Sequence, residues 1–218
     1  MVHFYSATLV RIYSALDMVG FFSKVFSPAS ADGDVDLRLL IEPLEDGWWY
    51  SLQLKNQRGI MVFLTDSDLQ PSGALNAKEV WKQKLNSSNK TKARYKLSTE
   101  SQSTKIVPAY SQFLSNVGGE GWLAVGDACM AFDPLAASGI KKALEDGLEA
   151  AEVIAEFLDG SQTLFKNYIS SRKKQFNNYL QNRHYYYLQE DRWPKSKFWQ
   201  RRQVIEPQSI GSYGKQQF

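Results

Sequence analysis

The chain has 218 residues, 43% of them apolar and 22% charged, values typical of a globular protein with a sizeable buried core. Its net charge of +3 is uneven, because the part from Phe165 onward carries eleven Lys/Arg against three Asp/Glu. The single cysteine, Cys129, excludes an internal disulfide, and the two histidines lack the partners and spacing of a zinc site, so we expect no metal.

The N-terminal segment from Val2 to Phe26 is rich in apolar residues and is interpreted as a helix followed by a strand. Arg11, Asp17 and Lys24 interrupt the apolar run, and each apolar stretch is too short to cross a bilayer. We therefore expect neither a signal peptide nor a membrane anchor. With a single cysteine, the sequence favours a cytoplasmic location.

Residues 18–66 have the pattern of short antiparallel strands. The β-rich runs are Val19–Phe26, Leu37–Leu44, Trp48–Leu54 and Ile60–Thr65. Short turn-forming connections at 45–47 and 55–59 favour a meander over parallel crossovers. Since side chains alternate along a strand, Trp48 and Tyr50 share one side, which either lines a substrate pocket or packs in the core.

The next segment is more mixed. Residues 77–86 predict a short helix, and the polar stretch 87–103 is interpreted as a mobile loop around a possible short helix. A strand is expected at 106–114. The glycine-rich turn 118–121 leads into a short apolar strand at 122–125.

The clearest helix begins near Ala137, with apolar residues at helical spacing from Ile140 to Leu158 and Gly160 as its stop. Its other face carries the charged residues Lys141, Lys142, Glu145, Asp146, Glu149, Glu152 and Glu156. A second helix, from Ser161 to about residue 188, contains the basic and tyrosine-rich segment.

Gly121 to Ile140 is the stretch with the strongest chemical signal. A strand delivers Gly126 and Asp127 at its carboxyl end, a loop with Pro134 follows, and a helix then starts. Ligands of α/β folds bind at such strand ends. The glycine permits close approach to the backbone, the aspartate accepts hydrogen bonds from hydroxyls, and a helix N-terminus offers free N–H groups.

This stretch resembles the second flavin-binding motif of the para-hydroxybenzoate-hydroxylase-like flavoproteins, in which Gly-Asp-Ala precedes a proline and then a glycine at a helix start. The resemblance implies FAD as cofactor. Asp127 would hold a ribityl hydroxyl, and the backbone of residues 138–140 would face the pyrimidine edge of the isoalloxazine. The implied cofactor contacts are Gly126, Asp127, Pro134, Ser138, Gly139 and Ile140.

Further segments are similar to a tryptophan-halogenase-like branch of that superfamily, which includes flavoproteins that mature quinone-bearing enzymes. These segments are Asp46–Ser51, Thr65–Leu69, Tyr185–Pro194 and Phe198–Arg202. The resemblance implies a monooxygenase or hydroxylase that reduces flavin, captures oxygen as a hydroperoxide and oxidises a small-molecule or peptide-borne aromatic substrate. The halogenase signature around paired tryptophans is not met, and no residue is assigned as catalytic.

Members of this superfamily begin with a βαβ unit whose G-x-G-x-x-G loop cradles the FAD pyrophosphate. No such loop occurs in this sequence. We therefore expect the C-terminal portion of an oxidoreductase, incomplete by itself and a weak binder of FAD. An apolar surface should be exposed near the Gly126 loop, to be covered by the missing N-terminal half or in a homodimer.

The predicted fold class is α+β: a mostly antiparallel sheet forming the substrate layer, a fragment of the FAD-domain sheet and two long C-terminal helices. We divide the chain into a β-rich substrate layer (1–120), the strand–loop–helix of the FAD motif (121–160) and a C-terminal helix with a basic, aromatic tail (161–218). The alternatives are a catalytically inactive remnant or partner subunit, and a nucleic-acid-binding protein that uses the tail.

Overall fold

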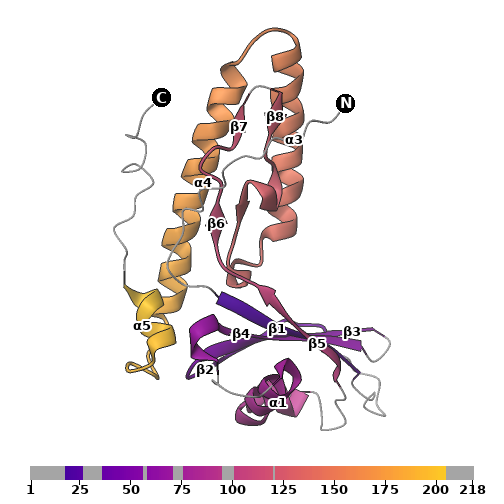
Figure 1. Ribbon diagram of the computed structural model, residues 1–218, viewed down its shortest axis with the longest axis vertical. Coiled ribbons are helices and arrows are strands. Elements are labelled where there is room, and N and C mark those ends of the chain that lie inside the picture. Colours follow the sequence, from indigo (N-terminus) through magenta and orange to yellow (C-terminus); the bar gives the residue numbers. More distant parts are fainter. Residues whose placement is uncertain are drawn as a thin grey trace. The chain divides into compact units, whose positions relative to one another are not determined.

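The computed structural model describes residues 18–26, 36–55, 58–70, 76–94, 101–119 and 121–204 (Figure 1). It has the predicted α+β fold, with a mostly antiparallel sheet and two long C-terminal helices. The strands are β1 (Met18–Phe26), β2 (Leu40–Leu44), β3 (Gly47–Leu54), β4 (Arg58–Asp66), β5 (Ser101–Pro108), β6 (Gln112–Phe113), β7 (Gly118–Gly119), β8 (Trp122–Leu123) and β9 (Met130–Ala131). The helices are η1 (Ser67–Leu69), α1 (Ala77–Ser87), α2 (Lys90–Arg94), η2 (Gly126–Ala128), η3 (Pro134–Ala136), α3 (Gly139–Leu158), α4 (Thr163–Leu188) and α5 (Lys197–Gln203).

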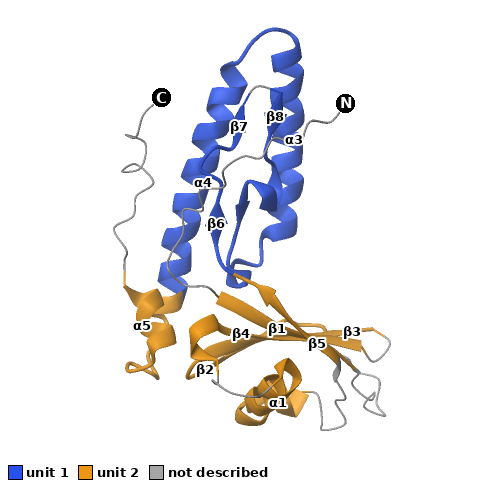
Figure 2. Cartoon of the chain, viewed as in Figure 1, with its two compact units in different colours: residues 1–15, 110–186, 205–218 blue, residues 16–109, 187–204 orange. Residues whose placement is uncertain are grey.

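The chain forms two compact units (Figure 2). Unit 1 comprises the described residues of 110–186, and unit 2 those of 16–109 and 187–204. The three-part division of the chain at residues 120 and 160 stays a prediction. The C-terminal segment contributes to both units, because α4 ends in unit 2 and α5 follows it there.

Unit 2 is built on a five-stranded antiparallel sheet of order β2-β3-β4-β1-β5. The tight β2–β3 turn requires glycine at position 47, since a Cβ there would stand 2.1 Å from the carbonyl oxygen of Leu64. A capping box of Asn76 and Glu79 starts α1, which covers one face of the sheet (Figure 1). Trp81 of this helix packs edge-on against Trp49 in the core.

A buried carboxylate starts α2. Glu42 of β2 accepts hydrogen bonds from the backbone N–H groups of Asn89, Lys90 and Thr91, at 2.8, 3.0 and 2.6 Å. Burial raises the pKa of Glu42, but the hydrogen bonds from Thr91, Lys90 and Asn89 outweigh it and leave the pKa below its ordinary value of 4.5. This carboxylate therefore fastens α2 to the edge of the sheet.

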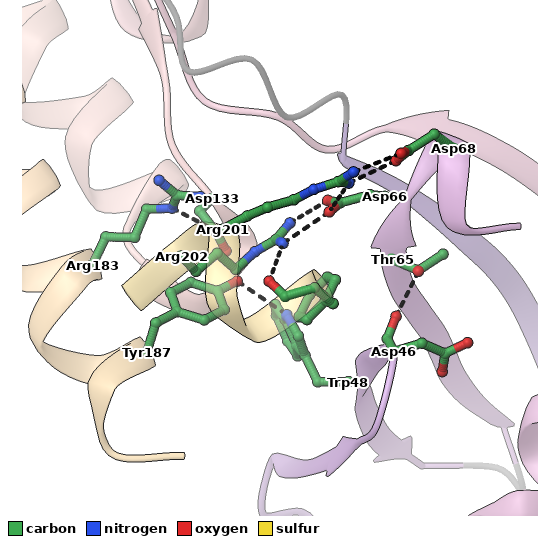
Figure 3. Close-up of polar contacts among 11 residues, drawn as sticks. Asp46, Trp48, Thr65, Asp66, Asp68, Asp133, Arg183, Tyr187, Arg201 and Arg202 are labelled. Atoms are coloured by element: carbon green, nitrogen blue, oxygen red, sulfur yellow. Dashed lines mark hydrogen bonds and ion pairs between the residues drawn. The ribbon is translucent and has the colours of Figure 1, made fainter. Parts of the chain in front are cut away.

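The segment 187–204 is held on unit 2 by aromatic and ionic contacts (Figure 3). The indole N–H of Trp48 donates to the Tyr187 hydroxyl at 3.1 Å, and both side chains are buried. Arg202 forms a two-point ion pair with the buried Asp66, while Arg201 bridges Asp66 and Asp68. Two of the segments that resemble the tryptophan-halogenase-like branch, Thr65–Leu69 and Phe198–Arg202, therefore join the end of β4 to α5.

Unit 1 consists of two two-stranded ribbons, β6–β9 and β7–β8, beside the antiparallel helices α3 and α4 (Figure 1). Its core contains Phe113, Cys129, Met130, Tyr168 and Phe176. Gly160 ends α3 with a φ of +88°, as its position in the sequence predicts.

The structure differs from the sequence-based elements in three places. The polar stretch 87–103, expected to be a loop around a possible short helix, contains the short helix α2 and also the start of β5, because pairing with β1 and capping by Glu42 offset its weak pattern. The strand expected at 106–114 is divided between β5 and β6. The helix expected before residue 18 lies outside the described residues. No helix in the described part combines the length and apolar character needed to cross a membrane.

Candidate functional site

The loop between β8 and α3 has two backbone features that set its path. Gly126 has a φ of +61°, a conformation that side chains other than glycine rarely adopt, and it lies against Ala143 of α3. Ala137, just before α3, is also left-handed, with a φ of +47°. Between them, η2, β9 and η3 fold the chain back on itself. The strand predicted at 122–125 is present, but its paired part is only Trp122–Leu123.

Asp127, the predicted ribityl contact, presents its carboxylate to solvent. Its side chain is 73% exposed, and one oxygen lies 3.1 Å from the ammonium of Lys142. Lys142 is itself buried, donates to the Met130 carbonyl at 2.7 Å and lies 5.3 Å from the centre of the Phe132 ring. A buried cation therefore orients Asp127 while the other carboxylate oxygen stays available to a ligand.

Asp133 organises the second half of the loop. Its carboxylate accepts the Leu135 N–H at 2.9 Å and pairs with Arg183 of α4 at 3.2 Å (Figure 3). The Asp133 N–H donates to the Tyr179 hydroxyl at 2.8 Å, and this hydroxyl also bonds to Ser111. Burial, together with the Asp133 charge, raises the pKa of Tyr179, so it stays a neutral hydroxyl. The turn that carries Pro134 is thus held in place by α4.

The N-terminus of α3 lies at the end of this loop. Ser138 is the N-cap residue, but its side chain makes no capping hydrogen bond, and the first helical bond runs from Lys142 N–H to the Ser138 carbonyl. A Cβ at Gly139 would meet nothing within 4 Å, and Ile140 is 83% exposed. The backbone N–H groups at this end are therefore open to an electron-rich ligand.

The orientation of α3 decides which of its two faces is exposed. The apolar stripe of the helix faces solvent: Leu144, Leu148 and Leu158 are 68%, 73% and 78% exposed. Two residues assigned to the charged face, Lys142 and Asp146, are instead buried. The reversal arises because α4 supplies cationic and hydroxyl partners to the charged face. It leaves an exposed apolar surface adjoining the Gly126 loop.

The buried charges of α3 form an ionic cluster with α4. Arg172 pairs with both Asp146 and Glu149, and its guanidinium lies over the Tyr168 ring at 4.7 Å. Burial and the Asp146 carboxylate raise the pKa of the neighbouring Cys129 thiol to about 11. The helical spacing of Lys142, Asp146 and Glu149 was the one sequence signal that could have identified this second face of the helix.

The two substrate residues predicted in unit 2 lie in β3. Trp48 is 2% exposed, and its N–H is engaged by Tyr187, whereas Tyr50 is half-buried. The adjacent Trp49 is fully buried on the opposite side of the strand. A substrate role for Trp48 and Tyr50 stays a prediction, and in this structure Trp48 is a packing residue.

Comparison with known proteins places these features in a family. The model of the FAD binding domain family matches residues 14–183. A protein of Marinomonas mediterranea named as an FAD-dependent oxidoreductase, LodB, is 29% identical over 166 residues, which are 76% of this chain and 44% of that protein.

Two solved structures share the fold. The flavin-dependent halogenase CmlS superposes with a TM-score of 0.77 at 19% identity, over 92% of this chain and 38% of that protein. The peptidyl tryptophan dihydroxylase QhpG, essential for tryptophylquinone cofactor biogenesis, superposes with a TM-score of 0.76 at 22% identity, over 92% and 46%. The chain spans less than half the length of each of these relatives.

Proposed function

Since the chain belongs to the FAD binding domain family, we propose that it forms the substrate-layer and ribityl-binding part of an FAD-dependent monooxygenase. The carrying observation is the exposed Asp127 carboxylate, oriented by the buried Lys142 at the start of a loop that ends in the uncapped N-terminus of α3. FAD is the cofactor of this family. The proposed reaction is oxygen transfer to an aromatic substrate that is a small molecule or part of a peptide.

The residues of the loop fit FAD. The free oxygen of Asp127 would accept a hydrogen bond from a ribityl hydroxyl, and the positive φ of Gly126 sets the turn that carries Asp127. The N–H groups of Gly139 and Ile140 would face the pyrimidine edge of the flavin, where their partial positive charge favours electron density. When bound, FAD supplies the redox chemistry that activates oxygen.

The remaining residues position these contacts. Arg183 and Tyr179 hold Asp133, which sets the Pro134 turn and with it the distance between Asp127 and the start of α3. Lys142 fixes the direction of the Asp127 carboxylate. This loop therefore needs no ordering by the cofactor, which lowers the entropic cost of binding.

The exposed apolar stripe of α3 supports a second part of the proposal, that a dinucleotide-binding half packs on this helix. The stripe alternates large residues, Leu144 and Leu148, with the small residues Ala143, Gly147 and Ala151. A Cβ at position 147 would meet nothing within 4 Å, so this row lets another element approach closely. Such a half would add the pyrophosphate-binding loop that the sequence lacks.

The test is reconstitution of FAD binding. The chain is mixed with the separately produced part of LodB that lies outside the matched residues, and bound flavin is measured by visible absorption after dialysis. We expect the chain alone to retain little FAD and the complex to retain it. Asp127→Ala should weaken FAD binding by about ten-fold or more, since a hydrogen bond to a charged group is lost. Asp159→Ala, an exposed carboxylate at the other end of α3, is the matched control.

A complex that forms without holding FAD would contradict the proposal and favour the alternative that the chain is a catalytically inactive partner subunit. Equal FAD affinity in the Asp127→Ala and Asp159→Ala variants would remove the assigned role of Asp127. A chain that keeps stoichiometric FAD by itself would show that no second half is needed.

A further inference from the structure

Unit 1 contains a groove of about 590 Å³ beside the candidate flavin loop. One wall is the loop from Phe132 to Ser138, and the other is the side of α4 from Ser171 to Tyr186. At a rise of 1.5 Å per residue, this part of α4 is about 22 Å long. The groove is therefore elongated, and it shares Ser138 with the predicted cofactor contacts.

Three side-chain amides recur along the floor of the groove. Gln175, Asn178 and Asn182 follow each other at three- and four-residue intervals, so they lie on one side of α4. Among the described residues none of the three amides has a hydrogen-bond partner, and the Gln175 oxygen is buried without one. An amide side chain carries the same donor and acceptor as a peptide bond. A row of them at one-turn spacing complements an extended backbone, which presents N–H and C=O groups repeatedly along its length.

The charge of the groove favours an acidic ligand. No Asp or Glu occurs in α4. Arg172 and Arg183 are engaged by carboxylates of unit 1, whereas the exposed Lys174 has no ion pair within the described part of the chain. Tyr186, which is 61% exposed, adds an aromatic surface to the same groove.

We propose that this groove binds an extended, acidic segment of a polypeptide substrate and so presents a neighbouring aromatic residue to the flavin loop. The inference rests on the proposed function and specifies its substrate as peptide-borne. At 1.5 Å per residue, the row of amides from Gln175 to Asn182 is about 10 Å long. An extended peptide of about seven residues, at about 3.3 Å each, spans the whole groove and with it all three amides, whereas a small aromatic molecule would fill only part of the groove. The repetition of one polar group along the groove therefore favours the polypeptide.

The test is peptide binding to the whole purified chain, without FAD. The probe is a fluorescein-labelled peptide of Asp, Trp and Gly residues long enough to span the groove, compared with a counterpart in which Lys replaces Asp, and affinity is measured by fluorescence anisotropy. We expect the acidic peptide to bind more tightly. Asn178→Ala and Asn182→Ala should each weaken binding by about five-fold, the loss of one neutral hydrogen bond. Lys174→Glu should weaken it by about three- to ten-fold.

Matched controls are available on the same helix. Asn167→Ala and Lys173→Glu change exposed residues of α4 outside the groove and should leave the affinity unchanged. All five positions are exposed, so thermal unfolding should show the same transition for every variant. Asp127→Ala should also leave peptide affinity unchanged, which separates this inference from the proposed role in FAD binding.

Several results would overturn the inference. The first is equal affinity for the acidic and the basic peptide. The second is an Asn178→Ala/Asn182→Ala double variant that binds the acidic peptide as tightly as the unchanged chain does. The third is preferential binding of oligothymidine that depends equally on Lys173 and Lys174. The last result would instead support nucleic-acid binding. If the reconstituted complex holds FAD while the acidic peptide fails to bind, only the peptide site is refuted. If the peptide binds as expected while the reconstituted complex does not retain FAD, only the proposed FAD site is refuted.

Discussion

Replacing Leu144 and Leu148 by glutamine should abolish association through α3 while leaving the folded chain intact. The side chains are 68% and 73% exposed, so the free chain has only about a third of their burial to lose. Full burial of a leucine stabilises by about 1.5–3 kcal/mol, and the expected cost to folding is therefore below about 1 kcal/mol for each substitution.

The effect on association should be much larger. A partner that covers the exposed two-thirds of each side chain gains about 1–2 kcal/mol per leucine, or about 2–4 kcal/mol for the pair. This corresponds to a loss of about 30- to 1,000-fold in the association constant, because each 1.4 kcal/mol is a factor of ten. The unchanged chain should self-associate or bind the part of LodB that lies outside the matched residues.

Sedimentation velocity gives the self-association, and titration calorimetry gives the affinity for the separate half. Denaturant unfolding checks that the double variant has kept its stability. Leu37→Gln/Ile106→Gln is the matched control, since these side chains are 53% and 49% exposed and belong to unit 2, whereas α3 belongs to unit 1. The reasoning is refuted if the unchanged chain neither self-associates nor binds the separate part of LodB more tightly than the double variant does.

Three further predictions concern the buried polar groups. Asp146→Ala should destabilise unit 1 by about 3–5 kcal/mol in denaturant unfolding, because it leaves the buried Arg172 without its main partner; Glu145→Ala, at an exposed position on the same helix, should cost less than about 0.5 kcal/mol. Because the pKa of Glu42 is lower in the folded chain than in the unfolded one, its stabilising contribution is complete above about pH 4.5 and is lost as the pH falls through the folded value. In the Glu42→Gln variant, the free energy of unfolding should therefore depend less on pH below about 4.5. An unchanged pH dependence in this range would contradict the prediction. Cys129 is fully buried with a pKa near 11, so it should react with a thiol reagent at neutral pH only when the chain unfolds, and rapid labelling of the native protein would disprove this.

Local patterns in the sequence determined much of the secondary structure and indicated the cofactor. Short turns between apolar runs predicted the antiparallel meander, and the helical spacing from Ile140 to Leu158 with Gly160 predicted α3. The Gly126–Asp127 motif indicated FAD, in agreement with the family match. These predictions succeed because turn geometry, residue periodicity and motif spacing are set by residues close together in the chain.

Tertiary structure decided what each of these faces contacts. Periodicity identifies an apolar stripe but not its partner, and in α3 the stripe is exposed while Lys142 and Asp146 are buried. Their burial depends on partners elsewhere: Asp127 on the motif loop and Arg172 on the neighbouring helix. A charge is buried only where an opposite charge or a hydrogen-bonding group meets it, and such a meeting of distant segments is a property of the folded chain that sequence spacing does not contain.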